Sequence, residues 1–208
     1  MKNAITMVST LLAAGVSMAQ VVNFDKDKAG VAPPDWTCGV TGSGKPRWTV
    51  EADPDAPSAP NVLMQSGAGD FPWCVRTGTA VQDGFVEVKF KPIRGRDDQA
   101  GGVVWRWKDG NNYYVARANA LESNVSLYYT EGGSRRTLKY VDAQVAANAW
   151  HVLRVEFKRT SIQVQLDGKA LIQFEDAHIA GTGAVGVWTK ADSVTAFDDF
   201  RFGIANPP

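Results

Sequence analysis

The chain has 208 residues with 22 basic and 22 acidic side chains, so its formal net charge at pH 7 is zero. A protein that binds nucleic acid or an anionic membrane surface through charge needs a surplus of Lys and Arg, so this balance argues against both classes. Hydrophobic residues make up 44% of the chain and charged residues 21%, which excludes wholesale disorder and predicts a globular protein.

The first 19 residues have the pattern of a secretory signal peptide. Lys2 provides a positive start, an apolar run follows, and Ser17-Met18-Ala19 fits a small-x-small cleavage site. The apolar run is short for a transmembrane helix, which leaves a buried N-terminal helix as the alternative. We therefore expect residues 1–19 to be removed and residues 20–208 to form a single exported domain without membrane insertion.

Cys38 and Cys74 are the only two cysteines of the chain. In an oxidising compartment an isolated pair most simply forms one disulfide. Closing a loop of about 36 residues would stabilise the fold by roughly 3–4 kcal/mol in the chain-entropy model. A zinc site is disfavoured, because two cysteines and two distant histidines lack the usual paired ligand spacing.

Short runs of alternating apolar and polar residues continue along the chain, and each predicts a strand with one buried face. In the run 85–90, the alternation places Val86, Val88 and Phe90 on one face. Further strand-like runs are 103–107, 113–119, 125–129, 150–158, 162–166, 170–174, 184–188 and 196–202.

Two of these runs are rich in aromatic and basic side chains. The period-two rule places Trp105 and Trp107 on one face of their strand, with Arg106 on the opposite face. In the next strand the same rule places Arg117 and Asn119 on one face. Which face of each strand is buried does not follow from the alternation, because a one-residue shift in register exchanges the two faces.

Turn residues separate the strand-like runs. Asp167-Gly168 between two runs is a strong hairpin signal, because both central residues of a type I′ turn need positive φ. Strands of this length at spacings of about ten residues indicate an antiparallel sandwich or barrel. The Pro-rich segment 53–60 is interpreted as a surface loop between strands, so one domain is the simplest organisation.

The most distinctive stretch is 101–128, GGVVWRWKDGNNYYVARANALESNVSLY. Together with the segments 149–157, 162–176, 183–189 and 197–202, it resembles the concanavalin A-like lectin/glucanase superfamily. Within that superfamily it is similar to laminin-G-like and 3-keto-disaccharide hydrolase type domains of bacterial secreted proteins. The resemblance implies an all-β, two-sheet antiparallel jelly-roll sandwich, ligands on a concave face, and a location in the bacterial periplasm or outside the cell.

The acid–base chemistry of the best-known glucanases of that superfamily is not encoded in this chain. Those enzymes carry the string E-x-D-x-x-E on one strand, which points a retaining pair of carboxylates to one face. The nearest string here, residues 51–55, contains a proline and lies in a predicted loop. An enzyme would have Glu122, His151 and Asp109 as its available acid–base groups, with unassigned roles.

A saccharide site needs aromatic faces for the C–H side of a pyranose and planar polar groups for its hydroxyls. Arg side chains inside apolar strands either line a cleft or pair with carboxylates on the sheet, and the aromatics alternatively fill the core. The candidate ligand-binding residues are Trp105, Arg106, Tyr114, Arg117, Asn119, Asn124 and Tyr128.

Acidic residues near the two ends of the domain suggest a structural Ca²⁺ ion, since the first and last strands of such sandwiches commonly neighbour each other. The candidate ligands are Asp198 and Asp199 with Asp25 or Asp27. The alternative is a set of solvated acids with one salt bridge to Arg201.

The leading hypothesis from the sequence is a secreted, monomeric carbohydrate-binding module with a saccharide or glycoside ligand. A glycoside-processing enzyme of the 3-keto-disaccharide hydrolase type is the first alternative. A laminin-G-like adhesion or structural domain is the second.

Overall fold

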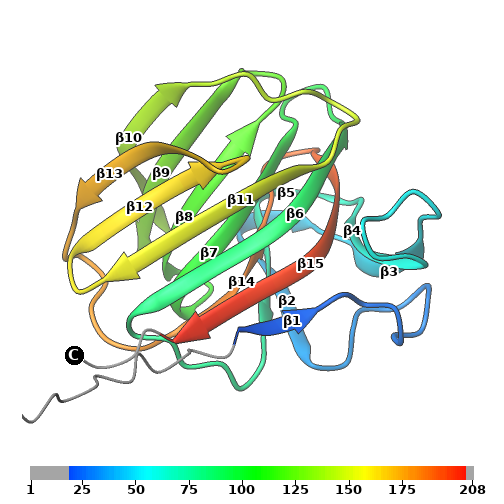
Figure 1. Cartoon of the computed structure of the whole chain (residues 1–208), viewed down its shortest axis with the longest axis horizontal. Coiled ribbons are helices and arrows are strands. Elements are labelled where there is room, and N and C mark those ends of the chain that lie inside the picture. The colour runs from blue at the N-terminus through cyan, green and yellow to red at the C-terminus, as the bar shows by residue number, and fades with distance from the viewer. Residues whose placement is uncertain (1–18, 205–208) are drawn as a thin grey trace, which may run out of the picture.

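The computed structural model describes residues 19–204, which form two antiparallel β-sheets and contain no helix (Figure 1). The predicted antiparallel sandwich is therefore confirmed. The predicted signal peptide lies almost entirely outside the described residues. Nothing in the described part of the chain is a helix of the length and apolarity that crossing a membrane requires.

One sheet has eight strands. They are β1 (Gln20–Val22), β3 (Trp48–Ala52), β4 (Asn61–Gln65), β6 (Gly84–Arg94), β11 (His151–Lys158), β12 (Ser161–Leu166), β13 (Lys169–Glu175) and β15 (Val194–Ile204). Their order is β13-β12-β11-β6-β15-β4-β3, and β1 pairs with β15. Strands from the start, middle and end of the chain are thus adjacent in one sheet, as expected of a jelly roll.

The other sheet has seven strands. They are β2 (Trp36–Lys45), β5 (Ala68–Arg76), β7 (Ala100–Asp109), β8 (Asn112–Asn119), β9 (Asn124–Glu131), β10 (Ser134–Asp142) and β14 (Ala184–Trp188). Their order is β10-β9-β8-β7-β14-β5-β2, so β10 and β2 are the edges. The edge strand β10 has a register irregularity against β9 between Thr137 and Lys139.

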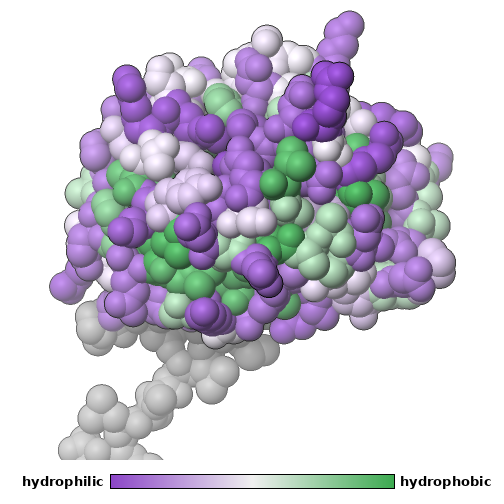
Figure 2. Space-filling view, turned by 90° about the horizontal axis from the view of Figure 1, so that it is seen from above, coloured by the Kyte–Doolittle hydropathy of each residue, from purple (hydrophilic) through white to green (hydrophobic). Residues whose placement is uncertain are grey.

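The main core lies between the sheets and follows from the alternation along each strand. Val86, Val88 and Phe90 of β6 are fully buried in it, as the period-two pattern predicts. Ion pairs lie on the outer face of the eight-stranded sheet, where Arg154 binds Glu87 and Lys89 binds Asp199. The surface in Figure 2 is mostly hydrophilic, with hydrophobic residues in small scattered groups.

Two local features agree with their sequence signals. Cys38 of β2 and Cys74 of β5 are directly opposite each other in the antiparallel register and form the expected disulfide. At the turn between β12 and β13, Asp167 has φ of 50° and Gly168 has φ of 77°. Positive φ at both positions is the condition that a type I′ hairpin sets.

The alternation in β7 breaks at Arg106, which has φ of 47°. The register of β7 against β8 is irregular between Trp105 and Asp109. Its register against β14 is irregular between Ala184 and Gly186, which pair with Trp107 and Val104. As a result Trp105 lies in the core between the sheets, whereas Trp107 packs on the outer face of its sheet. The expectation that both rings share a face is wrong, because an irregularity of this kind exchanges the two faces of a strand.

Candidate functional site

The outer face of the seven-stranded sheet carries a second buried cluster, separate from the core. The outer face of a two-layer sandwich normally meets water through polar side chains. Here alternate residues of β5, β7, β8, β9 and β14 form a buried apolar and aromatic group: Trp73, Val75, Val104, Tyr113, Val115, Tyr128 and Trp188. We call this face, with the side chains that project from it, the β8–β9 face.

One end of the β8–β9 face is closed by the hairpin between β7 and β8. Thr41 of β2 donates to the carbonyl of Gly110 in the turn, and its hydroxyl lies 2.8 Å from the Tyr113 hydroxyl. The ring of Trp73 is enclosed between glycines, since a Cβ on Gly39 would lie 2.6 Å, and one on Gly110 2.8 Å, from Trp73 Cζ2. The aromatics at this end therefore fill space beneath the hairpin.

The other end of the face brings an aromatic ring and a guanidinium together. Trp188 of β14 and Arg117 of β8 are both register partners of Gly102 on β7, which lies between them. A Cβ on Gly102 would lie 3.4 Å from Trp188 Cε3, 3.4 Å from Arg117 Cβ and 2.7 Å from the carbonyl of Ala116. Glycine at this position lets both side chains approach across the strand.

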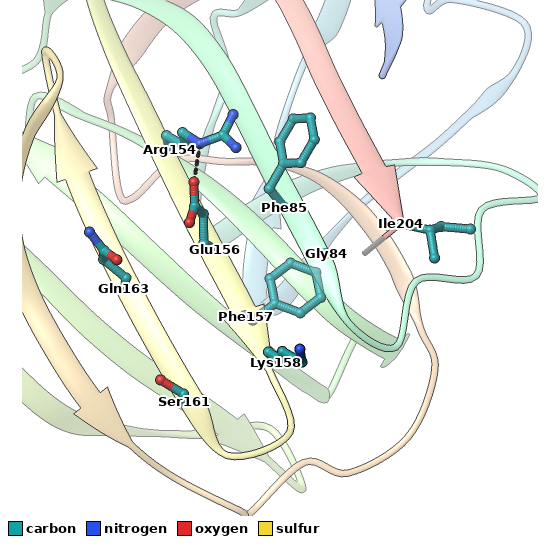
Figure 3. Close-up of a pocket in the computed structure, with 9 residues that line it drawn as sticks. All are labelled: Gly84, Phe85, Arg154, Glu156, Phe157, Lys158, Ser161, Gln163 and Ile204. Atoms are coloured by element: carbon teal, nitrogen blue, oxygen red, sulfur yellow. Dashed lines mark hydrogen bonds and ion pairs between the residues drawn. The ribbon is translucent and has the colours of Figure 1, made fainter. Parts of the chain in front are cut away.

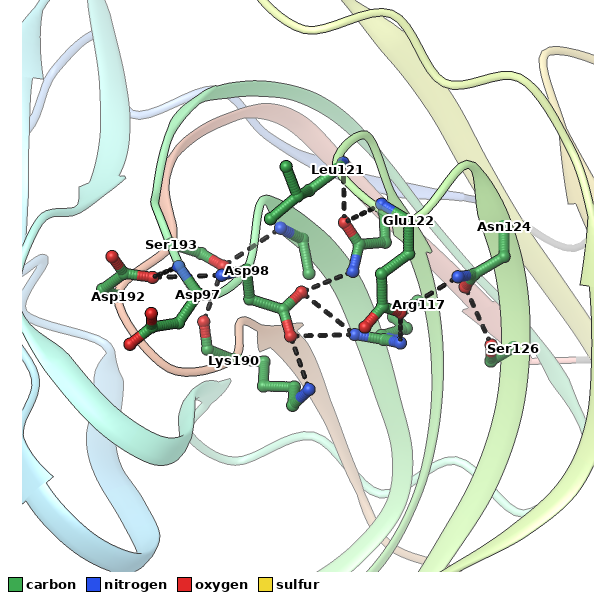
Figure 4. A network of polar contacts seen from close by, with 12 residues as sticks. Asp97, Asp98, Arg117, Leu121, Glu122, Asn124, Ser126, Lys190, Asp192 and Ser193 are labelled. Carbon is green, nitrogen blue, oxygen red and sulfur yellow. Dashed lines mark hydrogen bonds and ion pairs between the residues drawn. The ribbon is translucent and has the colours of Figure 1, made fainter.

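A buried carboxylate organises the polar part of the face (Figure 4). Asp98 is fully buried and accepts from Arg117 Nη1 at 3.1 Å and 3.3 Å, with Lys190 Nζ 2.6 Å away. The Asn119 amide donates to the same carboxylate. One carboxylate thus fixes side chains from β8 and from the loop after β14.

Glu122 completes this network in the turn between β8 and β9. It accepts from Arg117 Nη2 and, at 3.0 Å, from the Asn124 amide, which also donates to the Tyr140 hydroxyl at 2.9 Å. Partial burial opposes ionisation of Glu122, but the Asn124 hydrogen bond and the Arg117 charge hold its pKa below the usual range. Burial likewise opposes the Arg117 charge, and Tyr128 and the two acids raise its pKa. Both groups are therefore ionised near neutral pH.

The loop that presents Asp98 is itself held by hydrogen bonds. The Asp192 carboxylate accepts from the backbone N–H groups of Arg96, Asp97 and Asp98 at 2.7–3.1 Å. Three such bonds hold the pKa of Asp192 below the usual range, although burial acts in the opposite direction. A network supported in this way is preorganised, because its geometry does not depend on a ligand.

Several buried polar atoms on the β8–β9 face have no hydrogen-bond partner among the described residues. They are Trp73 Nε1, Trp107 Nε1, Arg117 Nε, Thr130 Oγ1, Arg135 Nη1 and Trp188 Nε1. Such atoms are uncommon in folded proteins, because a buried donor that is not hydrogen-bonded costs about 1–3 kcal/mol. Six of the ten such atoms among the described residues lie on this face, and the others are Trp36, Trp48 and Trp105 Nε1 and Arg201 Nε.

The structure brings together four of the seven ligand-binding candidates. Arg117, Asn119, Asn124 and Tyr128 all project from β8 and β9 onto the β8–β9 face. The Arg117 guanidinium carbon lies 5.8 Å from the centroid of the Tyr128 ring.

The other three candidates lie elsewhere. Trp105 and Tyr114 stack on each other inside the core. Tyr114 donates to Asp176, and burial together with this hydrogen bond raises its pKa. Arg106 donates to the carbonyls of residues in three loops, namely Gln82, Arg159 and Ile179. These three side chains therefore stabilise the sandwich rather than face a ligand.

The structure does not bring the three acid–base candidates together. Glu122 and Asp109 lie beyond opposite ends of β8, a strand that spans Asn112–Asn119. Asp109 accepts hydrogen bonds within its own turn from Asn111 and Asn112. His151 lies in the other sheet, and both of its ring nitrogens have partners, one 2.8 Å from Asp167 Oδ2 and one 3.0 Å from the carbonyl of Ala146.

The acidic candidates for calcium are only partly grouped. Asp25 and Asp198 both accept from the hydroxyl of Ser58, at 3.4 Å and 3.2 Å. Asp199 instead forms an ion pair with Lys89 at 2.7 Å. The described residues contain no group of three or more His, Cys, Asp or Glu side chains arranged to hold a metal ion.

Some residues of the β8–β9 face are absent from the sequence-based candidates. Asp98 and Lys190 lie in loops without hydrophobic periodicity, so no pattern connects them to Arg117. Trp188 ends a short apolar strand, where an aromatic side chain is equally consistent with core packing. Arg135 lies in the charged strand β10, whose sequence indicates a solvent-exposed edge strand.

A separate hollow of about 350 Å³ lies on the outer face of the other sheet, beside Phe85, Gln163 and Ser161 (Figure 3). Its guanidinium, Arg154, lies 4.0 Å from the centroid of the Phe85 ring and binds both Glu87 and Glu156. Because its central cation is already paired twice, this hollow is a weaker candidate than the β8–β9 face.

No protein-family model matches the sequence, and no curated protein matches it. Solved structures do match the fold. Carbohydrate-binding module CBM66 from Bacillus subtilis aligns with a TM-score of 0.65 and 18% identity, over 83% of this chain and 96% of that one. The β-glucanase of Bacillus licheniformis aligns with a TM-score of 0.58 and 13% identity, over 93% and 100% of the respective chains. A prokaryotic β-1,3-1,4-glucanase (lichenase) from a mouse hindgut metagenome aligns with a TM-score of 0.58 and 12% identity, over 90% and 99%.

At these identities the likeness concerns the fold. The chain shares with these structures the fold of a two-sheet antiparallel jelly-roll sandwich, which is the fold that the sequence resemblance implies.

Proposed function

We propose that this chain is an exported carbohydrate-binding domain that holds a saccharide on the β8–β9 face. The observation that carries the proposal is the combination of a fixed Asp98–Arg117 network with buried, unpartnered donors beside aromatic rings on the outside of a sheet. Saccharide hydroxyls are acceptors as well as donors, and pyranose C–H faces pack on aromatic rings. Among the aromatic rings of the β8–β9 face, those of Phe71, Trp107 and Tyr140 are at least partly exposed and can meet a sugar, whereas those of Tyr128 and Trp188 are buried.

Two further facts support this proposal. Solved structures with this fold include one described as a carbohydrate-binding module and others described as β-glucanases. The Cys38–Cys74 disulfide is typical of proteins that work in an oxidising compartment, as an exported protein does. Binding ranks before catalysis because Glu122, Asp109 and His151 lie apart and each is held by its own structural partners.

A glycan array followed by isothermal titration tests the proposal. Tyr140 is an exposed aromatic on β10 whose hydroxyl accepts from Asn124, so Tyr140→Ala removes a ring from the face without opening the core. We expect this variant to bind the array's best ligand about ten-fold more weakly. Lys169→Ala, at an exposed position of β13 in the other sheet, is the control and should bind normally. Absence of binding to every glycan, or equal binding by both variants, would reject the proposal.

A further inference from the structure

One cation on the β8–β9 face has no counterion. Arg135 is half-buried on the edge strand β10, and its guanidinium forms no hydrogen bond or ion pair with any described residue, although its Nη1 atom is buried. The remaining charges balance, because Arg117 is paired with Asp98 and Glu122, and Lys190 is paired with Asp98. Arg135 is therefore a surplus positive charge next to a neutral network.

The guanidinium of Arg135 is held by aromatic rings instead of acids. Its central carbon lies 4.3 Å from the ring centroid of Tyr128, 4.5 Å from that of Phe71 and 5.8 Å from that of Trp188. These rings come from three different strands, β9, β5 and β14. Cation–π contacts of this kind contribute about 0.5–2 kcal/mol each, and they leave the N–H donors at the edge of the guanidinium plane unused.

The electrostatics of this position favour an anion. Burial is the main cause that lowers the pKa of Arg135, and the positive charge of Arg117 also lowers it, whereas Tyr128 and Asp98 act in the opposite direction. A partly buried cation with a like-charged neighbour is unfavourable unless a negative group compensates it. Thr130, the cross-strand neighbour of Arg135 on β9, adds a second unpartnered polar atom.

We propose that Arg135 and the rings of Phe71, Tyr128 and Trp188 form a subsite for an acidic saccharide, in which the guanidinium binds the carboxylate of a uronic acid residue. A planar carboxylate matches the two-pronged donor geometry of a guanidinium and neutralises its charge, which a sugar hydroxyl does not do. The pyranose ring that bears the carboxylate then packs on the partly exposed ring of Phe71. This inference rests on the proposed function, because it names the class of saccharide for the same face.

The test compares acidic polysaccharides with a chemically matched neutral one. Polygalacturonate and alginate supply two different uronates, and fully methyl-esterified polygalacturonate has the same backbone without the negative charge. We expect the native chain to bind at least one uronate polymer about ten-fold more tightly than the methyl ester, in isothermal titration at low salt. Added salt should weaken binding to the acid and leave binding to the ester unchanged.

Variants assign the preference to Arg135. Arg135→Gln should reduce binding of the acidic polymer to the level of the ester. Arg136→Gln is the control, because Arg136 is the next residue on β10, is exposed and pairs with Tyr129, whose side chain packs against the core. This variant should bind like the native chain. A urea unfolding curve shows whether Arg135→Gln folds. If it does not fold, the comparison of acid and ester binding by the native chain still tests whether the face prefers a uronate.

The outcomes separate this inference from the proposed function. Equal binding of the acid and the ester, or an acid preference that persists in Arg135→Gln, overturns the uronate subsite. If neutral glycans then bind and Tyr140→Ala weakens that binding, the saccharide-binding function stands alone. If no glycan of either kind binds, both proposals fall.

Discussion

Arg117 Nη1 lies 3.1 Å and 3.3 Å from the two carboxylate oxygens of Asp98, and both side chains are almost completely buried. A buried pair of this geometry contributes little compared with apolar packing, but losing one member leaves an uncompensated charge. The pair is therefore better understood as a device that fixes the β8–β9 face than as a source of stability.

The first prediction follows from that asymmetry. Arg117→Ala should lower the free energy of unfolding by about 3–5 kcal/mol, because Asp98 stays buried with less compensation. Lys190→Ala removes the more exposed partner of the Asp98 carboxylate and should lower the free energy of unfolding by about 1 kcal/mol. Urea unfolding of the two variants measures both values. Similar small losses in both would contradict the assignment of Arg117 as the main partner.

The second prediction concerns the space for Trp73. Gly39→Ala places a methyl group 2.6 Å from Trp73 Cζ2, so the ring has to move. We expect a loss of about 1–3 kcal/mol in the free energy of unfolding, with a change in tryptophan near-ultraviolet circular dichroism. Thr37→Ala lies two residues away on the same face and is exposed, so it should leave the spectrum unchanged. An unchanged spectrum in Gly39→Ala would contradict the packing described.

The third prediction is a pH dependence that involves Glu122. Its pKa is lowered from 4.5 in the folded chain, so its contribution to stability is present above pH 4.5 and is lost as the pH falls through the folded value. Because Glu122 is partly exposed, the contribution should not exceed about 1 kcal/mol. The difference in unfolding free energy between the native chain and Glu122→Gln should therefore shrink on acidification. A difference that is independent of pH would be evidence against the Glu122–Arg117 interaction.

The fourth prediction concerns the disulfide, whose cysteines are 36 residues apart in sequence. Replacing both with alanine should lower the free energy of unfolding by about 3–4 kcal/mol, mainly by increasing the entropy of the unfolded chain. The double variant should still fold, because a domain of this size has an adequate core without a covalent link. Denaturant curves with and without reductant give the value, and the reductant should not affect the variant. A native chain that is equally stable in reductant would refute the prediction.

Much of the fold could be predicted from the sequence because its signals are local. Period-two alternation places the inner residues of β6 correctly, and the Asp167-Gly168 turn has the positive φ values that its residue types favour. The change of face at Arg106 has no local signal, because the residues around it are compatible with regular alternation. It reversed the expected position of one of the two tryptophans in β7.

The sequence predicts only those parts of the candidate site whose residues lie on one strand. Arg117 and Asn119 share a face by alternation, and the structure confirms that they do. Asp98, Lys190 and Arg135 reach the same face from two loops and an edge strand, so their proximity depends on the strand order of the whole sheet. The apolar–polar periodicity of one segment does not show which distant segment lies next to it.

The position of Arg135 on an edge strand has a consequence for how the molecule behaves at high concentration. An uncovered edge offers free backbone groups to another chain, and charged side chains or an irregular register discourage such pairing. Strand β10 has both, with Arg135, Arg136 and Lys139 along it and an irregularity at its centre. The same strand thus carries the surplus cation of the β8–β9 face and protects against aggregation, so variants that neutralise it should be studied in dilute solution.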